Sequence, residues 1–323
     1  MEYVGIQTQK KRNNVRSLAL LFLFPFLILA LIFLFYLLLF FLGGSDNFNT
    51  EILAYAFQMT LQSTPYVYIG VAIWFIIAYF ANTSIIKSAT GSHSLSRKEN
   101  KRIYNLVENL CMASGMKMPK INVIEDNSLN AFASGINNRT YTVTLTRGII
   151  DKLDDNELEG VIAHELSHIR NNDVRLLIIS IVFVGIFSMV AQVSLKSIRY
   201  MPMRTGNSKG KNGGGIIVVV LLLAVVAGIG YFFGTLLRFA ISRKREFLAD
   251  AGAAEMTKNP EALASALRKI STDPNVESVK RDDVAQLFIE HPGKQAKGFL
   301  GKLGGLFATH PSIKDRIQIL EQF

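Results

Sequence analysis

Residues 157–169 read ELEGVIAHELSHI, a segment in which apolar side chains recur at the spacing of an α-helix. Leu158 and Val161 belong to this apolar stripe, which is typical of the core-facing side of an amphipathic helix. Asp154 and Asp155 precede the stripe, and an aspartate there can cap the first free backbone N–H groups. We therefore expect a helix that opens at one of these two aspartates and packs against the core.

The middle of this helix carries His164, Glu165 and His168. Residues at i and i+4 lie on adjacent turns of one face, so both imidazoles can reach one zinc ion. Glu165 falls near the middle of the apolar stripe, where an unpaired carboxylate is costly. Its offset from the metal lets it hold a water molecule there instead of binding the ion. Alternatively, both histidines are surface groups on a charged helix, but Glu165 then serves no purpose.

A catalytic zinc site needs a third protein ligand, because such sites have three ligands and one open position. Residues 243–250 read RKREFLAD and follow the last apolar run of the chain. Glu246 and Asp250 share one helical face, at i and i+4. We expect Glu246 to be the third ligand and Asp250 to orient a ligating imidazole. The alternative is a solvated charged face with local ion pairs.

The composition indicates a membrane protein. Of the 323 residues, 50% are hydrophobic and 19% are charged, and the mean hydropathy is +0.28. Residues 18–42 contain no charged side chain, and about 20 apolar residues are enough to cross a bilayer. A second apolar run covers residues 66–81, so residues 18–82 are predicted to form a two-span hairpin. A purely soluble protein is excluded.

Two further apolar runs, at 176–195 and 216–241, predict a second hairpin within residues 176–241. The glycine-rich loop between them has no acidic residue and carries Lys196, Arg199, Arg204, Lys209 and Lys211. If both runs cross the membrane, this basic loop lies on the outer face, against the usual bias of membrane proteins. We favour four spans, with a shallow, re-entrant or protein-covered hairpin as the alternative.

The basic residues predict the orientation. Residues 1–17 form a basic tail, whereas the loop between the first two runs holds Asp46 and Glu51 but no Lys or Arg. By the positive-inside rule, the tail and the body that follows the second run are cytoplasmic, and the first run is an uncleaved anchor. The net charge of +10 therefore reflects topology, and nucleic-acid binding is not expected. The single cysteine, Cys111, excludes an internal disulfide.

The water-soluble body is expected to combine residues 83–175 with residues 242–323. A helix is predicted over residues 96–116, and short strands over residues 121–124 and 141–146. The predicted fold class is therefore α+β and mainly helical, with transmembrane helices and a small β-sheet.

Three separate motifs of this chain occur in an order that resembles one family of enzymes. They are residues 164–168 followed by Asn172 and Asp173, residues 243–250, and Thr309-His310-Pro311 followed by Arg316 and Ile317. Residues 130–135, which read NAFASG, and the four apolar runs extend the similarity over most of the chain. The chain thus resembles the membrane zinc endopeptidases of the HtpX type in peptidase family M48. Ser312 stands where a second proline is common in the late motif.

The resemblance implies a zincin-like metalloprotease domain with one Zn²⁺ per chain. In this arrangement His164, His168 and Glu246 bind the metal, Glu165 acts as the base and Asp250 lies behind the ligands. Residues Asn130, Ala131, Phe132 and Ala133 would form an edge strand that binds an extended substrate, although the segment alone reads equally as an ordinary loop. His310 is a further candidate catalytic residue that stabilises the developing oxyanion, or else it caps a helix before Pro311.

The expected function is hydrolysis of peptide bonds in membrane proteins at the cytoplasmic surface of the inner membrane. His168 shortly precedes the third apolar run and Glu246 shortly follows the fourth, so a metal between them lies near the bilayer. The expected partners are the lipid bilayer and membrane-protein or unfolded polypeptide substrates. The resemblance adds a role in protein quality control and the stress response.

Two other functions are compatible with parts of the sequence. An intramembrane prenyl-protein peptidase uses the same metal chemistry, but it is expected to need more spans than four. A membrane scaffold or transport subunit with a structural zinc site would explain the basic loop. Such a protein has no need for Glu165.

Overall fold

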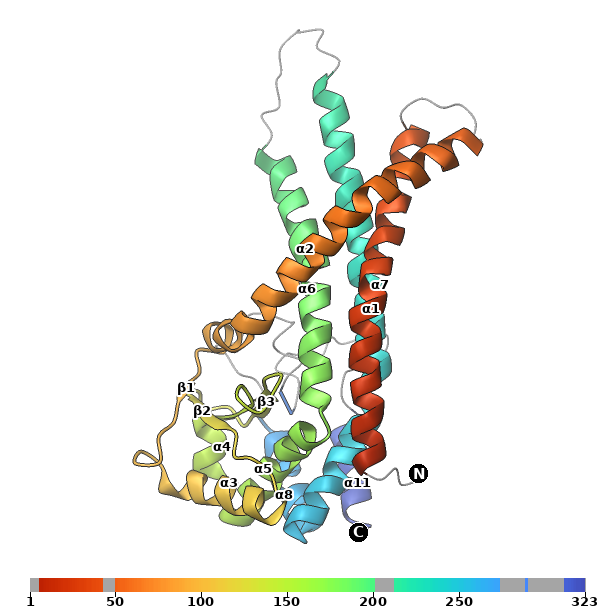
Figure 1. Ribbon diagram of the computed structural model, residues 1–323. Helices are drawn as coiled ribbons and strands as arrows, with labels where there is room; N and C mark the ends of the chain where they lie inside the picture. The colour runs from red at the N-terminus through yellow and green to blue at the C-terminus, as the bar shows by residue number, and fades with distance from the viewer. Residues whose placement is uncertain (1–5, 43–49, 201–211, 274–287, 290–310, 323) are drawn as a thin grey trace. The chain divides into compact units, whose positions relative to one another are not determined.

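The computed structural model describes residues 6–42, 50–200, 212–273, 288–289 and 311–322 (Figure 1). The chain divides into two compact units. Unit 1 consists of Met1–Ser17, Tyr79–Ile179 and Leu237–Phe323, and unit 2 consists of Leu18–Ala78 and Ser180–Leu236. The beginning of the chain, which the sequence predicts as a separate basic tail, thus groups with the segments that carry the candidate ligands.

Long helices make up unit 2 and continue along the chain into unit 1. They are α1 (Ile6–Leu42), α2 (Thr50–Thr90), α6 (Asp173–Tyr200) and α7 (Asn212–Thr257). Among the described residues, three segments are long and apolar enough to cross a membrane, namely Lys11–Leu42, Thr50–Thr90 and Asp173–Ser197. The apolar part of α7 among the described residues is shorter, Ile217–Phe232. Several membrane helices are therefore confirmed, and a fourth span stays a prediction.

The helices of unit 2 contact one another through aromatic side chains and small residues. The rings of Phe24 in α1 and Phe187 in α6 lie 5.6 Å apart. The indole N–H of Trp74 in α2 donates to the carbonyl of Val182 in α6 at 3.1 Å. Gly230 in α7 packs so closely against Phe187 that an added Cβ would lie 2.7 Å from that ring. Close approach at a small residue is the usual basis of helix packing in membranes.

Unit 1 contains a four-stranded sheet in the order β1-β2-β4-β3. The strands are β1 (His93–Ser94), β2 (Lys120–Ile124), β3 (Ala131–Ser134) and β4 (Thr142–Thr146). β2 and β4 are parallel, and β3 pairs antiparallel with β4, with Ala131 opposite Leu145. The two strands predicted from the sequence are β2 and β4, and the segment that resembled a substrate-binding edge is β3, which lies at the sheet edge.

Helices surround this sheet and make the fold mainly helical, as expected for an α+β protein. They are α3 (Lys101–Ala113), α4 (Arg147–Lys152), α5 (Asp155–Arg170), α8 (Pro260–Ile270) and α11 (Ile313–Leu320). The helix predicted over residues 96–116 is shorter, because the side chain of Asn100 accepts from the N–H of Ile103 and caps the helix there. Helix α5 packs against α3, α8 and β3, and α11 packs against α8.

The start of α5 is held by a capping box, as expected from its aspartates. The side chain of Asp154 accepts from the backbone N–H of Glu157, and the side chain of Glu157 accepts from that of Asp154. Glu157 is buried and also accepts from Ser265 Oγ at 2.7 Å and Lys269 Nζ at 2.6 Å, both on α8. The cap therefore fixes both the beginning of α5 and its placement against α8.

Helix α5 packs closely on α8 at Gly160, where a larger side chain should destabilise the fold. A Cβ at this position lies 3.1 Å from the backbone of Leu263, and the Cγ atoms of a larger residue have to fit into the same gap. We expect Gly160→Val to lower the free energy of unfolding by about 1–3 kcal/mol. Gly160→Ala is the matched control, because its gain in helix propensity of about 1 kcal/mol offsets the tight contact. Thermal unfolding in detergent measures both variants, and equal midpoints would contradict the proposed packing.

Candidate metal centre

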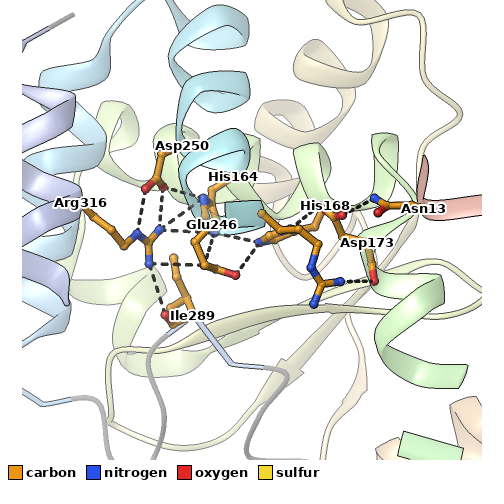
Figure 2. A network of polar contacts seen from close by, with 9 residues as sticks. Asn13, His164, His168, Asp173, Glu246, Asp250, Ile289 and Arg316 are labelled. Carbon is orange, nitrogen blue, oxygen red and sulfur yellow. Dashed lines mark hydrogen bonds and ion pairs between the residues drawn. The ribbon is translucent and has the colours of Figure 1, made fainter. Parts of the chain in front are cut away.

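The side chains of His164, His168 and Glu246 converge in unit 1 (Figure 2). The two histidines come from adjacent turns of α5, and Glu246 comes from the part of α7 that belongs to unit 1. The Nε2 atoms of the two rings lie 3.2 Å apart. Each is 3.6 Å from a carboxylate oxygen of Glu246, His164 from Oε2 and His168 from Oε1. The three residues that the sequence predicts as ligands are therefore brought together.

These separations fit a zinc ion. Tetrahedral zinc with ligands at about 2.0–2.1 Å places its ligand atoms about 3.4 Å apart. The observed spacings of 3.2 and 3.6 Å bracket that value. His164 and Glu246 are buried, and His168 is half-buried. Lone pairs that converge away from water need a positive charge between them, and two imidazoles with a carboxylate are typical zinc ligands.

Each imidazole is oriented by a separate carboxylate through its other ring nitrogen. Nδ1 of His164 lies 2.9 Å from Oδ1 of Asp250, and Nδ1 of His168 lies 3.1 Å from Oδ2 of Asp173. A carboxylate in this position accepts the Nδ1 proton and leaves the Nε2 lone pair for the metal. The sequence predicts this role for Asp250. The sequence predicts no such role for Asp173, although the position of this aspartate shortly after α5 could have indicated one.

Arg316 is buried in the site, and the sequence alone predicts no role for this residue. Its Nε and Nη2 atoms donate to the two carboxylate oxygens of Asp250 at 2.9 and 2.7 Å. Its Nη1 atom lies 3.7 Å from Oε2 of Glu246. Arg316 shares the buried face of α11 with Leu320, at i and i+4, and an arginine on an apolar face is the signal that could have identified it.

The charges of the site shift the pKa values of its members. Burial alone lowers the pKa of His164, as does the nearby Arg316, but the carboxylates of Asp250 and Glu246 outweigh both and raise it to about 9. Burial alone raises the pKa of Asp250, but Arg316 and His164 hold it below its ordinary value. The surroundings of His164 therefore favour a positive charge, which a proton or a metal ion can supply.

Glu165 is buried beside the ligand cluster. Burial raises its pKa, although the two histidines and a hydrogen bond from the backbone of Ala133 act in the opposite direction. A raised pKa suits a group that accepts and returns a proton near neutral pH. The hydrogen bond also shows that the outer edge of β3 faces this carboxylate.

The segment Asn130 to Ala133 lies at this edge, but its side chains do not all face the site. The side chain of Asn130 accepts from the N–H of Ala131 at 3.0 Å. Phe132 is buried against Phe288, with ring centroids 4.7 Å apart. The backbone N–H of Ile289 donates to the carbonyl of Ala131 at 2.8 Å, so a segment of the same chain already occupies one position of this edge.

Within the described part of the chain, no other histidine belongs to this cluster. His93 is exposed and lies 3.5 Å from Glu125. His310, the further catalytic candidate, and His291 lie outside the described residues. Cys111 is buried, and burial raises the pKa of its thiol to about 11.

Comparison with known proteins assigns the family. Residues 97–323 match Peptidase family M48. The chain belongs to this family. A protein of Bacteroides fragilis (strain ATCC 25285) named Protease HtpX homolog is 67% identical over 324 residues, which is 100% of both chains. A protein of the same name from Dictyoglomus thermophilum is 42% identical over 260 residues, 78% of this chain and 81% of its own.

The chain also resembles solved structures. The crystal structure of S. mikatae Ste24p matches with a TM-score of 0.47 and 19% sequence identity, over 97% of this chain and 66% of that chain. The M48 assignment rests on the sequence matches, which confirm the expected HtpX-type member of the family. The chain is thus a membrane metalloprotease, and M48 membership implies a metal, for which His164, His168 and Glu246 are the candidate ligands.

The buried position of Arg316 generates a second prediction. Arg316→Met removes the counter-charge of Asp250 inside the protein, which is expected to cost about 3–5 kcal/mol of folding stability. The variant should also bind zinc more weakly, because Asp250 is no longer held by Arg316 and orients His164 less firmly. Arg268→Met is the matched control, since this exposed arginine pairs with exposed Glu321 and such pairs are worth about 0–1 kcal/mol. Thermal unfolding and zinc content measure both, and equal losses would contradict the role of Arg316.

Proposed function

We propose that this M48 protein is a zinc endopeptidase that hydrolyses peptide bonds of membrane proteins, including misfolded ones, at the cytoplasmic surface of the cell membrane. The observation that carries the proposal is the cluster of His164, His168 and Glu246 with the buried carboxylate of Glu165 beside it. A structural zinc site would have four protein ligands and no use for a further buried carboxylate.

Glu165 is the residue to which we assign proton transfer. When zinc is bound, it lowers the pKa of a water molecule toward neutrality and polarises the carbonyl of the scissile bond. Glu165 accepts the proton of the attacking water and returns it to the nitrogen of the leaving amine. Its burial supports this role, because a carboxylate whose pKa is raised toward neutrality accepts a proton more readily and is still acidic enough to give it to the amine.

The edge of β3 is the proposed binding surface for substrate. An extended polypeptide can add to an unpaired strand edge by backbone hydrogen bonds, which accept almost any sequence. The backbone of Ala133 faces Glu165, so a substrate that pairs there brings a peptide bond near the base. Because Ile289 already pairs with Ala131, the substrate either pairs beyond that residue or displaces Ile289.

The position of the candidate ligands beside apolar helices along the chain supports membrane proteins as the proposed substrates. His168 precedes α6, and Glu246 lies in the same helix as the apolar segment Ile217–Phe232. Both ligand-bearing segments are therefore continuous with apolar helices along the chain. The basic tail and the acidic first loop favour a cytoplasmic body. A protease tethered in this way meets membrane proteins and segments next to their spans more often than soluble ones.

Removal of the Glu165 carboxylate tests the mechanism. Glu165→Gln keeps the shape of the side chain but cannot accept a proton, so we expect turnover to fall about 10²–10⁴-fold. The zinc content should stay unchanged, because Glu165 is not a ligand. Glu159→Gln on the same helix is the matched control and should cleave at the wild-type rate. Cleavage of casein and of an unfolded membrane protein by the full-length protein in detergent measures both, and proteolysis retained by Glu165→Gln would overturn the assignment.

Metal removal distinguishes the peptidase from a scaffold with a structural zinc. A chelator such as 1,10-phenanthroline should abolish cleavage by the wild-type protein, and added zinc should restore it. Since a structural site also binds metal, zinc content alone does not decide between the two. Wild-type protein that carries zinc but cleaves no substrate under any condition would favour the scaffold.

A further inference from the structure

Near its beginning, helix α1 carries a buried asparagine that contacts the carboxylate of Asp173 behind the metal centre. Asn13 of α1 is fully buried, while its neighbours Arg12 and Asn14 are exposed. Its Nδ2 atom donates to Oδ1 of Asp173 at 2.6 Å (Figure 2). The same atom donates to the carbonyl of Asn171 at 2.9 Å. Both amide protons are therefore used, and the carboxylate requires that the nitrogen rather than the oxygen face it.

Asp173 connects this asparagine to a candidate metal ligand. Its Oδ1 atom accepts from Asn13, and its Oδ2 atom lies 3.1 Å from Nδ1 of His168. Both oxygens belong to one rigid planar group, so a hydrogen bond that holds Oδ1 also sets the direction of Oδ2. The backbone carbonyl of Asp173 accepts from Arg245 Nη1 at 3.3 Å, which fixes the main chain but not the rotation of the carboxylate.

His168 depends on this support more than His164 does. The side chain of His164 is 1% exposed and is enclosed by buried groups, whereas that of His168 is 14% exposed. The carboxylate behind His164 is held by Arg316, and Asn13 takes the corresponding place behind His168. The two imidazoles are thus oriented by two carboxylates. Arg316, late in the sequence, holds one of them, and Asn13, early in the sequence, holds the other.

We infer that Asn13 is a positioning residue of the metal centre, acting on His168 through Asp173. The beginning of α1 is then part of the metalloprotease body and not only a basic tail that orients the first span. The inference rests on the proposed zinc site but not on proteolysis, because it concerns metal binding. It makes the ligand geometry dependent on residues that directly precede the first apolar run.

Zinc affinity of the full-length protein in detergent tests the inference, measured by competition with a chromophoric chelator. Loss of the group that is hydrogen-bonded to a ligating histidine typically weakens metal binding about 10–100-fold. Because Asn13 acts through that group, Asp173, we expect a loss at the lower end of this range, about 10-fold, for Asn13→Ala. Asn14→Ala is the matched control, because exposed Asn14 contacts only the side chain of Asn172 in the described structure, at 3.0 Å. Equal zinc affinities of the two variants would overturn the inference.

A double-mutant cycle separates positioning from a purely structural role. If Asn13 acts through Asp173, then Asn13→Ala should change zinc affinity little once Asp173→Asn is present. Additive losses would mean that Asn13 acts by another route and would contradict the inference. A lower unfolding midpoint of the zinc-stripped Asn13→Ala variant at unchanged zinc affinity would likewise show a structural role only.

A milder variant covers the case in which Asn13→Ala does not fold. Asn13→Ser keeps a hydroxyl, but its side chain is one atom shorter and holds Asp173 less well, so its zinc affinity should be lower than that of Asn14→Ala by less than about 10-fold. Affinity equal to that of Asn14→Ala would count against the inference. Cleavage assays show which of the two hypotheses fails. A wild-type protein that binds zinc but cleaves nothing refutes the proposed function and leaves the role of Asn13 untouched.

Discussion

The convergence of buried proton acceptors on one point is the constraint on which the site depends. Two imidazole nitrogens and the Glu246 carboxylate lie within 4.8 Å of one another, in a region that water hardly reaches. Such groups repel one another unless a positive charge lies between them, because burial removes the solvent that would otherwise stabilise them. A site of this kind is suited to a cation, because the free-energy cost of burying these groups together is offset only when a cation is bound.

Segments that are far apart in the sequence keep this arrangement in place. Helix α5 supplies both imidazoles, α7 supplies Glu246 and Asp250, α11 supplies Arg316, and the start of α1 supplies Asn13. Each histidine has a carboxylate behind it, and each carboxylate has a nitrogen donor behind it. The geometry of a metal site depends on such outer contacts nearly as much as on the ligands themselves.

The edge of β3, which we propose as the substrate-binding surface, lies beside Glu165. Glu165 receives a hydrogen bond from the backbone of Ala133, and Ile289 pairs with Ala131 two residues earlier. The carbonyl of Ile289 in turn lies 3.5 Å from Nη1 of Arg316. The strand edge, the base and the arginine behind the ligands are therefore linked by a series of hydrogen bonds.

The sequence by itself determined the parts of this protein that depend on local periodicity. The i, i+4 pairs at His164 and His168 and at Glu246 and Asp250 follow from the helical repeat, as do the capped start of α5 and the apolar helices. One local prediction was wrong in its bounds, because the side chain of Asn100 caps α3 later than the hydrophobic spacing indicates.

Only the tertiary structure decided which distant groups complete the site. Arg316, Asn13 and Ile289 lie far from the ligands in the sequence, and packing alone brings them there. Arg316 reads as one more basic residue until its helix buries it against Asp250, and Asn13 reads as part of a basic tail. Spacing along a helix is a property of the chain, whereas contacts between helices depend on how whole surfaces fit together.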